Sequence, residues 1–266
     1  MPGKGIRYID IPDTVTSIGD YAFYYCGFKS VTLPDGVTSI GNYAFNYCSS
    51  LTSVTIPDGV TSIGEGAFSS CWSLTSVTIP DSATSIGDKA FSGCDDLVSV
   101  TLPEGVTSIG KDMFSHCSSL TSVVIPSSVR SIASDAFSEC SRLKSIFYTG
   151  NKSQWEGLLK SGWNGVVTYY SYGYIYTIAP TVYLNVSDPS AGGEIYTPSN
   201  VSLYGITYDI FSDGTAGVKS ADTNITNADI PEEINGNPVK NIQNNAFRNC
   251  KQLYSVTIPE SVTSIG

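Results

Sequence analysis

Cysteine and histidine have the most distinctive side-chain chemistry in this chain, but their spacing argues against a reactive site. The seven cysteines follow one another at intervals of 22, 23, 23, 23, 23 and 110 residues, whereas zinc ligands are clustered. The single histidine, His116, precedes Cys117, and adjacent residues on a turn rarely face each other. No nucleophile elbow, P-loop or dinucleotide-binding motif is present. We therefore expect no catalytic residue, no cofactor and no metal.

Carboxylates recur with the same interval, directly after a series of prolines. The residues at this position are Asp13, Asp35, Asp58, Asp81 and Glu104. If successive units stack about 5 Å apart, as strands do, this column could recruit Ca²⁺. The alternative is a solvated acidic edge that aids solubility.

Hydroxyl side chains form two further columns on the predicted strands. The serine column is Ser30, Ser53, Ser76, Ser99, Ser122, Ser145 and Ser255, and the threonine column is Thr32, Thr55, Thr78 and Thr101, extended by Val124 and Phe147. A regular, uncharged face of this kind is typical of solenoids that bind ligands across their strands. The predicted binding residues are Ser53, Thr55, Ser76, Thr78, Ser99, Thr101 and Ser122. Alternatively, serine and threonine merely suit solvated parallel strands.

An internal repeat underlies all of these columns. The aligned prolines are Pro12, Pro34, Pro57, Pro80, Pro103 and Pro126, and the repeat resumes at Pro231 and Pro259. Phenylalanine, isoleucine and leucine recur once per unit in the same way. The cysteines are expected inside the stack as small apolar residues, although neighbouring units would also bring them within disulfide distance.

Segment 56–79 shows what each unit is expected to form. Its Leu-x-x-Val-x-Ile part predicts a short strand, Val60–Ile63 a second extended segment, and Glu65–Cys71 a helical turn on the opposite side. Burying about eight apolar side chains stabilises one unit by roughly 12–24 kcal/mol. Ordering its 23 residues costs about 35 kcal/mol. A unit therefore cannot fold alone, and the units must stack.

The pattern I-P-x-x-V-x-x-I-G-x-x-A-F-x-x-C-x-x-L-x-x-V resembles the BspA-like leucine-rich-repeat family over residues 8–148 and 228–266. The resemblance implies an α/β solenoid, namely a right-handed coil with parallel strands on one face and short helical turns on the other. Members are typically bacterial or protozoan surface proteins linked to adhesion and host-protein binding. No catalytic residues come with this family.

The repeat stops after residue 148, and three segments are expected. Residues 1–165 form the repeat array, which ends in a covering helix at 152–161 with Ser153 and Glu156 as its capping box. Residues 166–200 form a tyrosine-rich linker or a small β-rich segment, in which Tyr170, Tyr172, Tyr174 and Tyr176 predict one strand with an aromatic face. Residues 201–266 begin a second, truncated array with a hairpin around Ser212-Asp213-Gly214.

Composition narrows the possible partners. The net charge of −10 disfavours nucleic acid and anionic lipid, and no apolar stretch is long enough to insert into a membrane. We expect a non-catalytic, extracellular or cell-surface module that binds a protein or glycan, whose signal and anchor lie outside this fragment. A passive spacer that presents other domains is the alternative. An enzyme would need acids near the tyrosine-rich segment, where only Asp188 and Glu194 occur.

Overall fold

The computed structural model describes two compact units, Met1–Ile195 and Tyr196–Gly266. Within them it describes residues 8–159, 163, 165, 167–171, 174–178, 180–184, 194–196, 200–203, 206–225, 227–234 and 237–265. No helix in this part of the chain is long and apolar enough to cross a bilayer.

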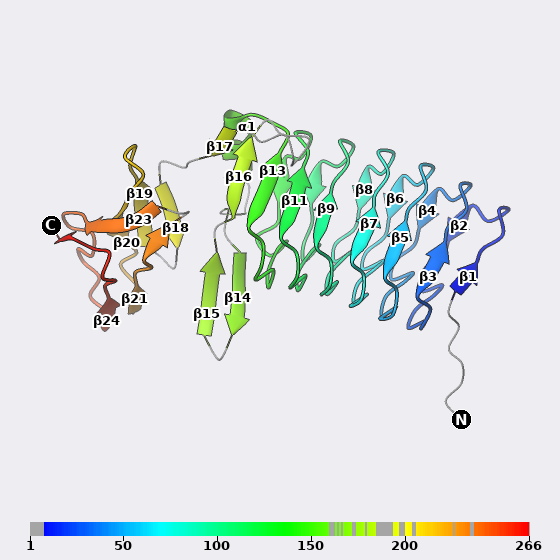
Figure 1. Cartoon of the computed structure of the whole chain (residues 1–266), viewed down its shortest axis with the longest axis horizontal. Helices are drawn as coiled ribbons and strands as arrows, with labels where there is room; N and C mark the ends of the chain where they lie inside the picture. Colours follow the sequence, from blue (N-terminus) through cyan, green and yellow to red (C-terminus); the bar gives the residue numbers. More distant parts are fainter. Residues whose placement is uncertain are drawn as a thin grey trace, which may run out of the picture. The chain divides into compact units, whose positions relative to one another are not determined.

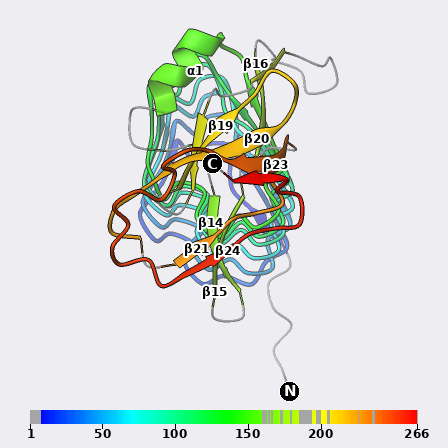
Figure 2. The same cartoon turned by 90° about the vertical axis from the view of Figure 1, so that its left-hand side faces the viewer.

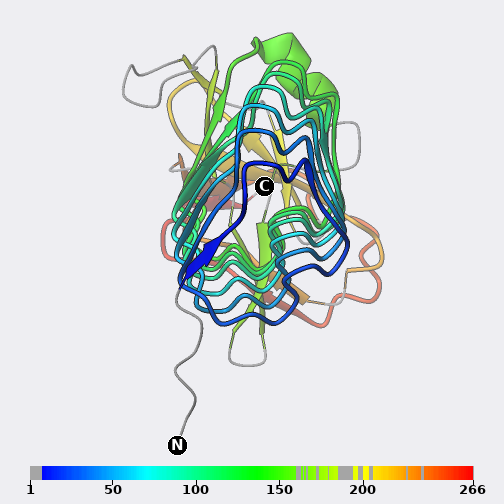
Figure 3. The same cartoon turned by 90° about the vertical axis from the view of Figure 1, so that its right-hand side faces the viewer.

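The first unit is a solenoid of parallel strands (Figure 1). Its main row comprises β1 (Tyr8–Asp10), β3 (Ser30–Thr32), β5 (Ser53–Thr55), β7 (Ser76–Thr78), β9 (Ser99–Thr101), β11 (Ser122–Ile125), β13 (Ser145–Tyr148) and β16 (Thr181–Leu184). A second row comprises β2 (Ser17–Ile18), β4 (Ser39–Ile40), β6 (Ser62–Ile63), β8 (Ser85–Ile86), β10 (Ser108–Ile109) and β12 (Ser131–Ile132). Equivalent residues pair, such as Val54 with Val77, so successive coils nearly superpose along the array (Figure 3).

Strands β3, β5 and β9 alternate between exposed and buried residues as predicted. In β5, Val54 is buried between exposed Ser53 and Thr55, and Ile56 just beyond the strand is buried as well. The inward side chains meet the phenylalanine column, whose rings stack in parallel from coil to coil. Centroids are 5.1 Å apart for Phe45 and Phe68 and 5.6 Å apart for Phe68 and Phe91. The predicted stacking of units around one apolar interior is confirmed.

Besides its two strands, each coil has a third side, which consists of tight turns. The predicted helical turn at Glu65–Cys71 is therefore not confirmed. The hydrogen-bond partners of the backbone amides alternate along this segment. The amides of Ala67 and Ser69 donate to the carbonyls of Gly64 and Gly66 in the same coil. The amides of Gly66 and Phe68 donate to carbonyls of the next coil. In an α-helix the amides would donate to carbonyls four residues earlier in the same segment. The alternation instead gives lateral bonds between coils and requires residues with positive φ, such as Gly66 at +57°.

Gly64 is required by the close approach of two coils rather than by the turn that its sequence context suggests. A Cβ atom there would lie 2.5 Å from the backbone nitrogen of Asn42 in the preceding coil. Gly41 and Gly87 occupy the same position and face the same obstacle. At these three positions the Ile-Gly pair therefore allows the close approach of neighbouring coils.

Helix α1 (Lys152–Leu159) lies beside the last coils of the first unit (Figure 2). Its capping box differs from the predicted one, because Asn151 and Gln154 exchange bonds of 2.9 and 3.0 Å between side chain and backbone amide. Ser153 and Glu156 therefore do not form the box, which lies two residues earlier. Trp155 is buried against Tyr148. The ring centroid of Trp163 lies 5.5 Å from that of Phe137, at the end of the phenylalanine stack.

The tyrosine-rich segment forms two strands, β14 (Val167–Ser171) and β15 (Tyr174–Ile178), rather than the single predicted one. They are antiparallel, with Tyr169 opposite Tyr176. Tyr172 lies outside the described residues. Strand β17 (Glu194–Tyr196) neighbours β16 in the main sheet.

The second unit begins antiparallel and continues as a parallel coil. Its strands are β18 (Asn200–Leu203), β19 (Ile206–Ile210), β20 (Ala216–Ala221), β21 (Asn227–Asp229), β22 (Glu233–Ile234), β23 (Asn237–Ile242), β24 (Ser255–Thr257) and β25 (Ser264–Ile265). The predicted hairpin is confirmed as β19 and β20. Strands β20, β23 and β25 pair in parallel, as do β21 and β24.

Candidate binding surface

The seven predicted binding residues lie on the outward face of β5, β7, β9 and β11, here named the strand face. Six of them, Ser53, Thr55, Ser76, Thr78, Ser99 and Thr101, are exposed, and Ser122 is half-buried. The register aligns them into columns, with Ser53 beside Ser76, Thr55 beside Thr78, and Ser99 beside Ser122. The structure therefore brings these residues together on one face.

The hydroxyls of the strand face are free to act on a ligand. None makes a hydrogen bond to another residue among those the structure describes, since their backbone amides and carbonyls alone pair in the sheet. A hydroxyl both donates and accepts, so the surface can match amides, carbonyls or sugar hydroxyls. Charge is absent from these positions, and recognition would rest on short-range complementarity.

The end of the threonine column departs from this pattern. Val124 pairs with Thr101 in register but is only 5% exposed. Phe147 is half-buried and stacks on Tyr183 of β16 with ring centroids 4.9 Å apart. Both residues extend the predicted column along the chain, yet the free hydroxyl surface stops before them.

The cysteine column is buried and reduced. Cys48, Cys71, Cys94, Cys117 and Cys140 are fully buried free thiols, so the disulfide alternative is not realised. Each donates a hydrogen bond of 3.0 to 3.3 Å to a phenylalanine carbonyl of the preceding coil. Each of these carbonyls also accepts the backbone amide of the cysteine three residues later, so the thiol adds a second hydrogen bond. Sequence reasoning missed this role, because nothing in the pattern shows that a thiol of the next coil reaches the carbonyl.

Burial also removes the nucleophilic character of the thiols. Desolvation raises the pKa of Cys48 to about 12 and raises the pKa of Cys117 well above its ordinary value. His116 is exposed, at a positive φ of 61°, while the Cys117 thiol bonds to Phe91 inside the coil. The two side chains therefore lie on opposite sides of the backbone, and they cannot form a nucleophile–base pair.

The acidic column lies on the surface. Asp13, Asp35, Asp58, Asp81 and Glu104 are all exposed, and Glu104 accepts a hydrogen bond of 3.1 Å from the hydroxyl of Thr149. Within the described residues, no three histidine, cysteine or acidic side chains converge as metal ligands would. The column therefore has the geometry of a solvated edge.

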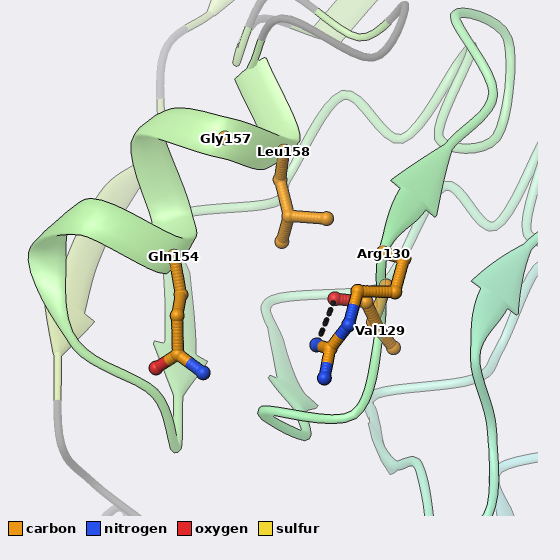
Figure 4. A pocket seen from close by; sticks show the side chains of 5 residues that line it. All are labelled: Val129, Arg130, Gln154, Gly157 and Leu158. Atoms are coloured by element: carbon orange, nitrogen blue, oxygen red, sulfur yellow. Dashed lines mark hydrogen bonds between the residues drawn. The ribbon is translucent and has the colours of Figure 1, made fainter.

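One pocket of about 450 Å³ lies between α1 and the turn before β12 (Figure 4). Val129, Arg130, Gln154, Gly157 and Leu158 line it. The Arg130 guanidinium donates to the carbonyl oxygens of Ser127 and Val129 rather than to an acid. This lining has no pair of titratable groups suited to proton transfer. Of the acids considered for an enzyme, Asp188 lies outside the described residues and Glu194 begins β17.

A stack of parallel-strand coils with a shared interior and a regular outer face defines a solenoid repeat protein. A family model described as a BspA-type leucine-rich-repeat region matches in six copies, over residues 3–78, 61–157 and 220–266. The chain belongs to this family. No curated protein matches it.

Solved structures that are similar to this chain include the following two. A leucine-rich-repeat protein of T. pallidum has 36% identity and a TM-score of 0.52, over 54% of this chain and 70% of that one. A leucine-rich cell surface protein from Faecalibacterium prausnitzii A2-165 has 30% identity and a TM-score of 0.50, over 98% of this chain and 66% of that one. The present chain thus spans about two thirds of the length of the F. prausnitzii protein.

Proposed function

We propose that the chain is a non-catalytic binding or adhesion module of a cell-surface or secreted protein. It would recognise extracellular proteins or glycans through the strand face. The observation that carries the proposal is the set of aligned, outward and unpaired hydroxyls on β5, β7, β9 and β11. The similarity to a protein described as a cell surface protein supports the location.

The array suits repeated weak contacts. Each coil presents the same serine and threonine positions in register, so a ligand with its own repeat would meet several equivalent contacts. Linked contacts of modest strength add through avidity, whereas no single strong anchor is present on this face. Extended matrix proteins and glycan chains are ligands with such a repeat.

The test is a matched pair of charge insertions. Thr78→Glu/Thr101→Glu places two carboxylates on the strand face, and Ser85→Glu/Ser108→Glu places two on exposed positions of the second row of strands. Binding to immobilised fibronectin, laminin, collagen and a mammalian glycan array is measured by biolayer interferometry and fluorescence. The first variant should bind at least tenfold more weakly, a loss of about 1.4 kcal/mol, while the second binds like the parent.

Equal binding by parent and strand-face variant would refute the proposed surface. Failure of the parent to bind any of these probes would instead favour a passive spacer, which needs the rigid stack but no ligand.

A further inference from the structure

Six aromatic residues form a second distinctive surface on the turn side of the first three coils. This aromatic patch consists of Tyr21, Tyr24, Tyr25, Tyr43, Tyr47 and Trp72. Exposed fractions are high for such large apolar rings, at 73% for Tyr25, 56% for Tyr21 and 48% for Trp72. Contiguous exposed apolar surface is uncommon on a soluble protein and marks interaction sites.

The rings contact one another continuously. Tyr21 stacks on Tyr43 with centroids 5.2 Å apart, and Tyr24 packs edge-on against Tyr21 at 5.8 Å. Tyr47 lies 5.7 Å from Tyr25 and 6.1 Å from Trp72, which come from the coils on either side of it. The patch is therefore one surface across three coils rather than a set of isolated rings.

The fold does not require these rings. Later coils carry small or polar residues at the same repeat positions. Tyr43 is replaced by Gly66 and Lys89, Tyr47 by Ser70 and Gly93, and Trp72 by Asp95 and Ser118. Those coils have the same backbone hydrogen bonds and the same phenylalanine stack. Stacking of coils thus gives no reason for aromatic residues at these positions.

The backbone makes tyrosine an unfavourable choice at four of them. Tyr21, Tyr25, Tyr43 and Tyr47 have φ values of 55°, 62°, 54° and 59°. This is the left-handed region, where a side chain costs free energy and glycine does not. Later coils use glycine there at Gly66 and Gly93, and polar residues with the same positive φ at the other positions, namely Ser70, Lys89, Asp112, His116 and Glu139. The backbone conformation therefore does not explain aromatic residues here, of which Tyr21, Tyr25 and Tyr47 are exposed and Tyr43 is half-buried. Bulky rings kept in this conformation indicate a role other than stability.

The surroundings of the patch are polar and acidic. Asp20 accepts from the backbone amide of Asn42, and Glu65 accepts from the Tyr43 hydroxyl, which raises the pKa of Tyr43 to about 12. Lys89 lies 3.8 Å from Glu65 and is thereby paired. Carboxylates accept hydrogen bonds from sugar hydroxyls, and phenol hydroxyls both donate and accept them, while the acids repel anionic ligands.

We propose that the aromatic patch binds a neutral polysaccharide. The apolar C–H faces of pyranose rings would stack on the tyrosines and Trp72, and their hydroxyls would bond to Asp20 and Glu65. Rings from successive coils repeat at 5.7 and 6.1 Å, close to the length of one sugar unit in an extended chain. This site lies on the turn segments and does not depend on the function proposed for the strand face.

The test uses neutral and acidic polysaccharides as probes. Affinity electrophoresis of the full chain is run in gels containing β-glucan, galactomannan, dextran or arabinogalactan, with alginate and polygalacturonate as acidic comparisons. Trp72 is the exposed tryptophan, whereas Trp155 and Trp163 are each 1% exposed. Binding at the patch should therefore protect tryptophan fluorescence from quenching by acrylamide. We expect at least one neutral polymer to retard the protein and to protect its tryptophan fluorescence. We expect no retardation by the acidic polymers.

The variant Tyr25→Ser/Tyr47→Ser/Trp72→Ser installs residues found in other coils and should fold, which circular dichroism checks. Its affinity for the retarding polymer should fall at least tenfold, and Ser85→Glu/Ser108→Glu, on exposed positions outside both surfaces, should leave that affinity unchanged. Absence of retardation by every neutral polymer, or equal retardation of parent and aromatic variant, overturns the proposal. A second outcome also overturns the proposal: the parent self-associates in sedimentation velocity, the aromatic variant does not, and neither binds a polysaccharide. That outcome would assign the patch to contact with a second copy of the chain.

Discussion

The thiol of Cys94 donates a hydrogen bond to the carbonyl oxygen of Phe68, 3.3 Å away in the preceding coil. The same bond joins each of the other buried cysteines to its phenylalanine, for example Cys117 to Phe91. A small apolar residue would fill this space, but the carbonyl would keep only its hydrogen bond from the backbone amide of Cys71, at 3.4 Å, and lose the second one. Cysteine therefore both packs and completes the hydrogen bonding of the turn.

We expect native alkylation to separate the cysteines into two groups. Iodoacetamide should modify Cys26 and Cys250, which are half-buried, before any of the fully buried thiols. Burial raises the pKa of Cys94, and thiolate, the reactive form, is scarce there. Peptide mapping by mass spectrometry gives the rates. Modification of Cys94 as fast as Cys26 in the folded protein would contradict this, and a denatured sample provides the control.

Stability should fall at alkaline pH because of the same thiols. Above pH 9 the unfolded chain loses thiol protons, whereas folded Cys48 keeps its proton up to about pH 12. The folded state then binds more protons, so the free energy of unfolding decreases with pH, by at most about 1.4 kcal/mol per pH unit for each buried thiol. Below pH 9 this contribution is constant.

Urea unfolding under reducing conditions from pH 7.5 to 10 measures the slope. Cys94→Ala should be less stable than the parent at pH 7.5, yet its stability should decline less steeply. An unchanged slope would show that Cys94 ionises alike in both states.

Phe91→Ala should cost about 3–5 kcal/mol of unfolding free energy. Phe91 is fully buried between Phe68 and Phe114, with ring centroids 5.6 and 5.7 Å away, so truncation removes two stacking contacts and leaves a cavity. Tyr254→Ala serves as control, because Tyr254 is 92% exposed and its loss should change stability by less than about 0.5 kcal/mol. Thermal and urea unfolding measure both, and a loss below about 1 kcal/mol at Phe91 would be incompatible with a tightly packed stack.

His116→Gly should stabilise the protein by roughly 1 kcal/mol. His116 has a φ of 61°, and the equivalent position of the preceding coil is Gly93 at 69°. The reciprocal change Gly93→His tests the same cause, since a Cβ atom there meets only ordinary contacts at 3.5 Å but acquires the backbone strain. It should destabilise by a similar amount. Changes of the same sign in both variants would exclude backbone strain as the cause.

Periodicity alone predicted the main features of this fold. The proline, phenylalanine and cysteine columns each recur once per coil, and their stacking follows because a single unit is too small to fold. The outward placement of Ser53 and Thr55 followed from strand alternation. Whether these side chains bind anything remains a prediction, because a free hydroxyl face is necessary for such binding but does not identify a ligand.

Other features could not be predicted because they depend on how one coil faces the next. The turn at Glu65–Cys71 resembles a helix in sequence, and only the lateral acceptors of the next coil divert alternate amides away from helical bonding. The predicted capping box was wrong by two residues, because both Asn151-x-x-Gln154 and Ser153-x-x-Glu156 fit the motif. The aromatic patch was missed because Tyr21 and Tyr43, like Tyr25 and Tyr47, share a repeat position in only two coils and form no column along the array. The contacts that join the two pairs to Tyr24 and Trp72 arise when coils stack.

The alternating amides of the turn segments also limit how such a gene can change in length. Unequal recombination that duplicates one whole unit would add a coil whose lateral donors and acceptors meet their neighbours in phase. Gain or loss of a single codon between residues 65 and 71 would exchange the inward and lateral amides and leave both adjoining coils mismatched. Lineages should therefore differ in the number of complete coils far more readily than in the length of the turn segment, and changes in unit length should lie outside it, as in the 22-residue spacing from Pro12 to Pro34.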